Sequence, residues 1–329
     1  MPAIVSHHIF GRSLLPDLDA GFCQTRDARD AFLLGNQGPD PLFFATRSLA
    51  LVRIKKLGSL MHRERIEELL GVWRQRVLDT SGHQRAVLRA YLSGFLCHFT
   101  LDSIAHPLVL AFEEALVHAG VTGLDPRDHS YVHGQIEADL DVFLLHEMSG
   151  RTLDEYVLPK QVLYAGNTIL KLIDRLYDVA ARQVYQLAVP HTAFSRGVHD
   201  MRLVVAVSYS PGGTKRRLLG KLERLARPHS LLQAMSHQKD AYLDCWYANE
   251  QKETWLHPQS RKPRHESYRE LFALARQQAL SAIQLFWDGA DPFAITGGQN
   301  FLGNEAEVRG KRTKERARLA SLPGSPGWA

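Results

Sequence analysis

The amino-acid sequence predicts a mainly α-helical protein, built as a bundle of many helices. Apolar residues recur with the period of an α-helix in many windows, whereas the best strand signal is one valine-rich run, residues 203–208 (LVVAVS). Hydrophobic residues make up 45% of the 329 residues, which is enough to bury a core. Many helices with apolar faces and almost no strands favour a helix-on-helix architecture.

Five segments carry the helical period in the order of the chain. They are residues 63–78, 84–101, 132–147, 164–187 and 265–287. The second segment is apolar over most of its surface, which predicts a buried helix. Turn-forming residues separate the segments and mark the expected loops.

The expected organisation is one helical domain over residues 1–302, followed by a tail. Residues 303–329 are polar and basic, then rich in Pro, Gly and Ser, which predicts a disordered tail. Ten of the 16 histidines lie before residue 150. We therefore expect the chemistry mostly within residues 1–145 and covering helices within residues 146–302.

Charge, cysteine content and the N-terminal residues limit the function classes. The formal net charge of +5 permits contact with anionic surfaces but does not require a nucleic acid as partner. No signal-peptide pattern opens the chain and no unbroken apolar run reaches ~18 residues, so we expect a cytoplasmic protein. Cys23, Cys97 and Cys245 are scattered and odd in number, which predicts neither a disulfide framework nor a cysteine zinc site. A bound metal would need His, Asp and Glu ligands.

The most informative stretch is residues 98–107 (HFTLDSIAHP). In a helix His98, Asp102 and His106 stack on one face, because side chains four residues apart are neighbours. Burying such groups without partners costs several kcal/mol, and a metal ion removes that cost. The alternative is a hydrogen-bonded His–Asp pair in the core with His106 exposed. Pro107 predicts that the helix ends or kinks after His106.

A second stripe at the same spacing consists of His133 and Glu137. Imidazole and carboxylate together suit zinc and related metals. Asp141 extends this stripe by one turn, whereas Asp139 points elsewhere and is expected to be a solvated charge. The alternative for His133 and Glu137 is an ordinary surface pair.

Three further candidates lie nearer the N-terminus. Asp40 stands between two prolines on a glycine-rich turn, which would hold its carboxylate stiffly. His62 and the pair His7-His8 could belong to the same site. Taken singly, Asp40 could be an ordinary turn aspartate, His62 a surface histidine and His7-His8 incidental.

The order of these groups resembles the bacterial zinc-dependent phospholipase C family. The resemblance covers about residues 1–145 and rests on an ordered series of motifs. This series is Ser6-His7, Gly38-Pro39-Asp40, His62, His98-x3-Asp102-x3-His106-Pro107 and His133-x3-Glu137. It is similar to a cytoplasmic branch of the family, which shares a helical fold and a three-zinc site with S1/P1-type nucleases. A helical bundle of the phospholipase C/P1 nuclease type is therefore the expected fold.

The resemblance implies three sets of ligands. One zinc would take Asp40, His62, His98 and Asp102. A second would take His106, His133 and Glu137. A third would take His7 and share Asp102. In the secreted enzymes the third ion also binds the free amino group of an N-terminal Trp, which this chain lacks. Here His8 or the amine of Pro2 would take its place, or the third site would remain empty. The gap from Asp102 to His106 is also shorter than in the secreted enzymes.

The resemblance also implies an activity, namely the hydrolysis of phosphodiester bonds by a water that two to three zinc ions activate. Asp40 would orient or deprotonate that water besides binding metal. The expected substrate is a phospholipid or another phosphodiester. One alternative is a nuclease-like phosphodiesterase, with nucleic acid as the less favoured partner and with Phe43, Phe44 or Tyr131 as stacking platforms. The other is a non-catalytic protein in which zinc staples the helices.

Residues 215–227 (KRRLLGKLERLAR) form a basic amphipathic pattern. Such a helix could lie on an anionic membrane, which would give the protein a peripheral membrane contact. The alternative, which we favour from the sequence, is a core helix with a solvated basic face.

Overall fold

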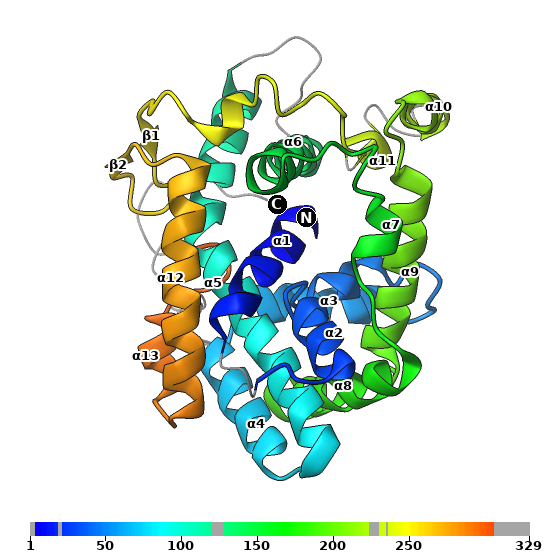
Figure 1. Cartoon of the computed structure of the whole chain (residues 1–329), viewed down its shortest axis with the longest axis vertical. Coiled ribbons are helices and arrows are strands. Elements are labelled where there is room, and N and C mark those ends of the chain that lie inside the picture. Colours follow the sequence, from blue (N-terminus) through cyan, green and yellow to red (C-terminus); the bar gives the residue numbers. More distant parts are fainter. Residues whose placement is uncertain (1–3, 19–21, 120–127, 224–229, 235, 306–329) are drawn as a thin grey trace, which may run out of the picture.

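The computed structural model describes residues 4–18, 22–119, 128–223, 230–234 and 236–305, and in this part the chain is helical (Figure 1). The N-terminal helices are α1 (Ile4–Leu14), η1 (Leu15–Asp17), α2 (Arg26–Gly35), η2 (Asp40–Phe44), α3 (Leu51–Arg63), α4 (Ile66–Leu78), α5 (Gly82–His118) and α6 (His129–Ser149). The later helices are α7 (Leu158–Gln161), α8 (Asn167–Val179), η3 (Ala180–Val184), α9 (Ala193–Ser208), α10 (Thr214–Glu223), α11 (Leu231–Ala234), η4 (Trp246–Ala248), α12 (Tyr268–Trp287) and α13 (Pro292–Thr296). The two short strands, β1 (Trp255–Leu256) and β2 (Pro263–Arg264), pair antiparallel. The predicted mainly α fold is confirmed.

Helix α5 forms the centre of the bundle. It runs for 37 residues, and both α2 and α12 pack along it. Among the described helices it alone is long and apolar enough to cross a membrane, although it contains no unbroken apolar run of that length. Most of its apolar stretch is buried inside the fold. We expected this helix to end or to kink after His106. It continues for eleven residues beyond Pro107, as far as His118, so the first of these alternatives is wrong.

Two glycines allow α2 and α5 to approach closely. A Cβ added to Gly35 would lie 2.2 Å from the carbonyl oxygen of Tyr91, and one added to Gly94 would lie 2.1 Å from that of Phe32. Any side chain at either position would therefore force the two backbones apart. This contact brings the turn after α2, which carries Asp40, against the middle of α5.

The first turn of α1 is held by a carboxylate from α6. Asp141 accepts hydrogen bonds from the backbone N–H groups of Val5 and Ser6, at 3.0 and 2.8 Å. These N–H groups have no partner within their own helix, and a negative charge at a helix N-terminus is favourable. His237 Nε2 lies 2.8 Å from the same carboxylate. Asp141 thus extends the stripe of His133 and Glu137 as expected, but it fixes α1 rather than facing the other site residues.

The valine-rich run 203–208, which gave the best strand signal in the sequence, is the last part of the helix α9. In the helix Val198, Met201 and Val205 lie on one buried face, while Leu203 and Val207 are exposed. The β-branched residues favour a strand only weakly, and burial of this face outweighs that preference.

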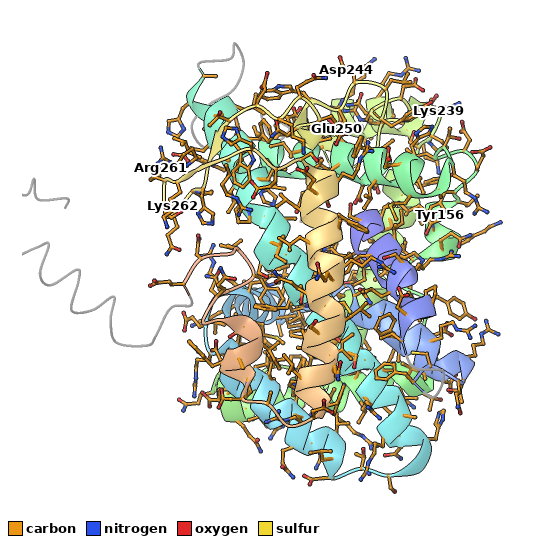
Figure 2. All side chains as sticks on the ribbon, turned by 60° about the vertical axis from the view of Figure 1, so that its left-hand side comes forward. Tyr156, Lys239, Asp244, Glu250, Arg261 and Lys262 are labelled. Atoms are coloured by element: carbon orange, nitrogen blue, oxygen red, sulfur yellow. The ribbon has the colours of Figure 1, made fainter. Side chains whose placement is uncertain are left out.

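The segment between α11 and α12 lies at one edge of the molecule, where Lys239, Asp244 and Glu250 are labelled in Figure 2. Helix α12 begins with a capping box, in which Ser267 and Glu270 satisfy each other's backbone N–H groups. This helix then runs along α5 and completes the bundle.

Two predictions about the C-terminal half need correction. Helix α10 is not a core helix, because Gly220 is its one buried residue while Leu218 and Leu222 are exposed. The predicted start of the tail, residue 303, is too early in the chain, because Glu305 forms a β-bridge with Gln299. Residues 306–329 of that tail, and residues 224–227 of the basic pattern, lie outside the described residues.

Candidate metal centre

The fold brings all eight candidate metal-binding residues into one buried region between α1, α3, α5 and α6. Five different elements contribute side chains to it. These are His7 from α1, Asp40 from η2, His62 from α3, His98, Asp102 and His106 from α5, and His133 and Glu137 from α6. Their donor atoms form three groups, and within each group the atoms lie within 4.8 Å of one another.

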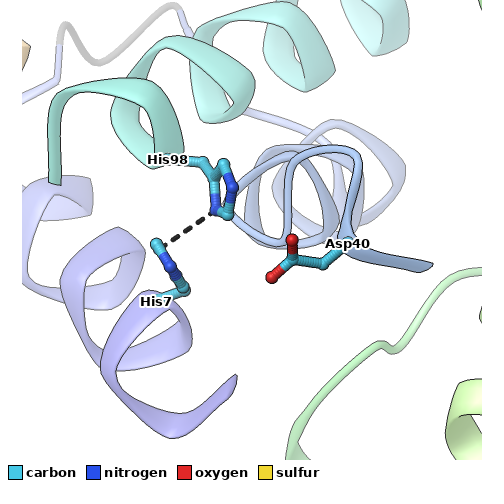
Figure 3. Close-up of side chains that lie close together, drawn as sticks. All are labelled: His7, Asp40 and His98. Atoms are coloured by element: carbon cyan, nitrogen blue, oxygen red, sulfur yellow. Dashed lines mark hydrogen bonds between the residues drawn. The ribbon is translucent and has the colours of Figure 1, made fainter. Parts of the chain in front are cut away.

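Two overlapping groups form a first cluster, of which Figure 3 shows three members, His7, Asp40 and His98. The Nδ1 atoms of His7 and His98 lie 3.1 Å apart. His62 Nε2 lies 3.1 Å from Asp40 Oδ1. Asp102 reaches both remaining imidazoles, with its oxygens 3.1 Å from His7 Nε2 and 3.3 Å from His98 Nε2.

The third group forms a second cluster at the junction of α5 and α6. Glu137 Oε1 lies 3.4 Å from His106 Nε2 and 3.2 Å from His133 Nε2, and the two imidazole rings are stacked. Asp102 Oδ1 lies 3.3 Å from His106 Nδ1. Asp102 therefore contacts residues of both clusters and joins them.

The residues present fit bound metal ions. His98 Nε2 and His106 Nδ1 are buried, and although each lies 3.3 Å from an oxygen of Asp102, neither makes a hydrogen bond of good geometry with the described residues. Buried nitrogen atoms without a well-formed hydrogen bond are costly, and a cation at each cluster would satisfy them. The donors are imidazole nitrogens and carboxylate oxygens, the set that zinc accepts in proteins.

The charges of the site favour ionised carboxylates. Burial raises the pKa of Asp102, but the imidazoles of His106, His98 and His7 outweigh this effect and hold it well below its usual range. Burial, assisted by His7, lowers the pKa of His98 to about 4, so its imidazole is neutral at pH 7 and has a free lone pair. His106 differs, because Asp102 and Glu137 overcome the effect of burial and raise its pKa to about 10. In the metal-free protein the proton on His106 offsets part of the negative charge of Asp102 and Glu137.

Hydrogen bonds from the surrounding structure orient three of the imidazoles. His62 Nδ1 lies 2.8 Å from the carbonyl oxygen of Gly58, and His98 Nδ1 lies 3.1 Å from the carbonyl oxygen of Asn36. His133 Nδ1 lies 2.7 Å from Glu113 Oε2. With Nδ1–H donating to these acceptors, the Nε2 lone pairs face the clusters. Sequence reasoning missed Asn36, Gly58 and Glu113. Glu113 lies seven residues after His106 on the same helix, so a search at that spacing would have found it.

Two aromatic residues from the C-terminal half cover the site. Tyr268 lines a cavity of about 20 Å³ together with His7, Asp102, His106 and Glu137. The ring of Phe301 lies 4.9 Å from that of His62 and 5.5 Å from that of His98, and the backbone N–H of Phe301 donates to the carbonyl of His62. No sequence signal distinguishes these two residues from ordinary core aromatics.

Other candidates from the sequence lie outside the clusters. His8 faces another side of α1, where its ring packs near Tyr156 (labelled in Figure 2), and burial lowers its pKa to about 4. Asp139 is half-buried and accepts a hydrogen bond from Gln135, so it is not the solvated charge that we expected. Phe44 belongs to the core, whereas Phe43 is half-buried and its ring lies 5.3 Å from that of His62.

The fold and the site define a class of helical proteins with clustered histidine and carboxylate ligands. A sequence model of one family, described as zinc dependent phospholipase C, matches residues 3–187, which is more than half of the chain. The chain therefore belongs to the zinc-dependent phospholipase C family. No curated protein and no solved structure matches the chain. All eight candidate ligands fall within the matched residues, while Tyr268 and Phe301 lie beyond them.

Proposed function

We propose that this protein is a zinc-dependent hydrolase of phosphodiester bonds with a phospholipid substrate, acting as a phospholipase C. The observation that carries the proposal is the position of Asp102, whose carboxylate contacts His7 and His98 on one side and His106 on the other. Two ligand clusters that share one carboxylate would hold ions close together, the arrangement that phosphodiester hydrolysis uses. Family membership supports the same activity.

The ligand distribution is part of the proposal. A first ion would be held by Asp40, His62, His98 and Asp102, and a second by His106, His133 and Glu137. The distance of 3.1 Å between His7 Nε2 and Asp102 Oδ1 supports His7 as a ligand of a third ion that shares Asp102. His8 faces away from the clusters and is not part of this set.

In the proposed mechanism the residues of both clusters would hold zinc, which would supply a water that is nucleophilic near neutral pH and would neutralise charge on the phosphate. Asp40 accepts the proton from that water at its carboxylate. Burial raises the pKa of this carboxyl group, but the hydrogen bond with His62 and the electrostatic effect of the neighbouring imidazoles outweigh burial and hold the pKa below its usual value, so the group is ionised and able to accept a proton. Tyr268 lines the small cavity beside these ligands, and its hydroxyl group would donate a hydrogen bond to an oxygen of the phosphate once the substrate has widened that cavity.

Two alternatives make different predictions. The half-buried ring of Phe43 beside His62 is the one observation that favours a nuclease-like enzyme, because a base could stack on it. A non-catalytic protein would bind zinc without turnover. We further propose a cytoplasmic location, and the three cysteines, which are free, are compatible with a reducing compartment.

Metal content and turnover measured on one preparation test the proposal. Zinc is quantified by mass spectrometry on untagged protein, and hydrolysis of bis(p-nitrophenyl) phosphate is followed before and after chelation. We expect two or three zinc ions per chain and activity that chelation removes and zinc restores. Phosphatidylcholine and single-stranded DNA are then compared as substrates. Cleavage of DNA alone would favour the nuclease, and zinc without turnover of any substrate would overturn the proposed activity.

A further inference from the structure

The segment from Thr46 to Lys56 exposes apolar side chains at the surface. Leu49 is fully exposed, at 109% of its reference area, and Val52 is 80% exposed, which makes them the two most exposed large hydrophobic residues of the described chain. Single exposed hydrophobic residues are common, but these two are only three positions apart in the chain, and together we call them the apolar tip.

The same part of the chain is strongly basic. Residues 41–63 contain Arg47, Arg53, Lys55, Lys56 and Arg63 and no acidic residue, so this stretch has the same net charge, +5, as the whole chain of 329 residues. Arg53, Lys55 and Lys56 are exposed, and none of them takes part in an ion pair among the described residues. Within the described part of the chain, basic side chains therefore lie near the apolar tip in sequence without an acidic partner.

The base of this segment is held firmly against α9. Asp200 accepts hydrogen bonds from the backbone N–H and the guanidinium of Arg47, at 3.0 and 2.6 Å. Gly197 of α9 lies so close to Pro41 that an added Cβ would be 2.2 Å from its carbonyl oxygen. Helix α3 lies behind α2 and near α9 in Figure 1. The apolar tip is thus presented by a fixed support.

We propose that Leu49, Val52, Arg53, Lys55 and Lys56, which we call the α3 surface, dock the protein onto an anionic phospholipid membrane. Leucine and valine would enter the interface while the basic groups contact anionic headgroups, the two-part attraction that holds peripheral proteins on membranes. This segment connects η2, which carries Asp40, to the helix that carries His62. The inference rests on the proposed function, because docking would bring the site to a surface made of its substrate.

Helix α10 provides a matched control. Its Leu218 and Leu222 are 58% and 57% exposed and also lie on a basic helix. They differ from the α3 surface because α3 carries the candidate ligand His62, whereas α10 carries none of the candidate ligands. A membrane attraction that depended only on exposed leucine and basic charge would use both surfaces equally.

Sedimentation with lipid vesicles tests the proposal on the full-length, zinc-loaded protein. Vesicles of phosphatidylcholine, alone or in an equimolar mixture with phosphatidylserine, are compared for wild type and for two double variants, Leu49→Ser/Val52→Ser and Leu218→Ser/Leu222→Ser. We expect wild type to bind the mixed vesicles, the first variant to bind roughly tenfold more weakly or worse, and the second to bind as wild type. A third variant, Lys55→Gln/Lys56→Gln, should lose affinity for the mixed vesicles and not for phosphatidylcholine alone.

Folding and activity controls keep the result interpretable. All substituted side chains are exposed, so the thermal midpoint and the hydrolysis of monomeric dihexanoyl phosphatidylcholine should not change. Absence of vesicle binding by wild type, or loss of binding in the α10 variant alone, would overturn the proposal. A change in self-association at Leu49 and Val52 without a change in vesicle binding would assign the surface to a second copy of the chain and also overturn it.

The same assays separate this inference from the proposed function. Vesicle binding without hydrolysis of any phospholipid would leave the α3 surface standing and overturn the activity. Hydrolysis of the monomeric lipid without vesicle binding would do the reverse.

Discussion

Glu113 holds His133 from the side of the ring opposite to Glu137. Its Oε2 lies 2.7 Å from His133 Nδ1, while His133 Nε2 lies 3.2 Å from Glu137 Oε1. The second oxygen of Glu113 lies 2.6 Å from His129 Nδ1. Glu113 thus determines which nitrogen of His133 is available to a metal, without belonging to either cluster.

Replacement of Glu113 should weaken metal binding while the fold is kept. In Glu113→Ala the ring of His133 loses its orienting acceptor, and we expect zinc affinity at the second cluster to fall roughly 10- to 100-fold. Competition with a chromophoric chelator measures the change. Glu114→Ala is the control, because Glu114 is exposed and pairs with Arg261 instead. Equal affinities in the two variants would contradict the role of Glu113.

Asp102 should be the most sensitive position of the site. In Asp102→Asn the charge that both clusters share is removed, and we expect activity to fall by roughly two orders of magnitude or more together with the zinc content. Elemental analysis and phosphodiester hydrolysis measure the two effects. The control is Asp139→Asn, a half-buried acid of α6 outside the clusters. Full activity with full zinc in Asp102→Asn would refute the ligand assignment.

Tyr268 should affect turnover more than metal binding. Burial raises the pKa of its hydroxyl group, which therefore stays protonated and able to donate a hydrogen bond. In Tyr268→Phe we expect kcat/KM to fall roughly 10- to 100-fold, the effect of losing a hydrogen bond to a charged group, with the zinc content unchanged. Unchanged kinetics would restrict Tyr268 to packing.

The metal-free protein should lose stability as the pH rises. The pKa of His106 is raised from 6.5 to about 10, since Asp102 and Glu137 outweigh the lowering caused by burial. A raised pKa means that the folded state binds the proton more tightly, so this stabilisation is complete below pH 6.5 and is lost as the pH passes about 10. Zinc must displace the same proton, so its affinity should rise over this range. Urea unfolding in the presence of chelator and zinc competition at several pH values test both trends, and His106→Gln should flatten them.

The close contact between α2 and α5 should tolerate no side chain. In Gly94→Ala the new Cβ would lie 2.1 Å from the carbonyl oxygen of Phe32, so we expect a loss of about 1–3 kcal/mol in the free energy of unfolding. Gly71 in α4 has no atom within 4 Å of an added Cβ, and Gly71→Ala should stabilise the protein by about 0.5–1 kcal/mol. Urea titrations compare the two variants, and an equal effect would contradict the packing argument.

The helical fold was predictable because it depends on local periodicity. The stripe of His98, Asp102 and His106 follows directly from the spacing of four residues on α5. The grouping of Asp40 and His62 with that stripe came from the resemblance to a family, since no local rule brings a turn after α2 and the end of α3 to the middle of α5. The glycine contact between α2 and α5 is the physical cause, and it is visible only in the structure.

Predictions failed where tertiary contacts outweighed local preference. The run 203–208 is helical because α9 buries Val198, Met201 and Val205 on one face. Helix α5 continues through Pro107, which cannot donate a hydrogen bond to the carbonyl of Ser103. Gly303 packs against that carbonyl and against the proline ring, with an added Cβ at 2.4 Å from the oxygen. Such a contact between positions 200 residues apart leaves no trace in a local pattern.

The hydrogen bond from Phe301 to the carbonyl of His62 has a consequence for the order of biosynthesis. The candidate ligands end at Glu137, yet the rings that cover them belong to residues translated more than one hundred positions later. A ribosome must therefore synthesise the chain as far as Phe301 before both rings can cover the ligands. We infer that a nascent chain exchanges metal freely until Phe301 has emerged, and that the ligands are covered only from that point on.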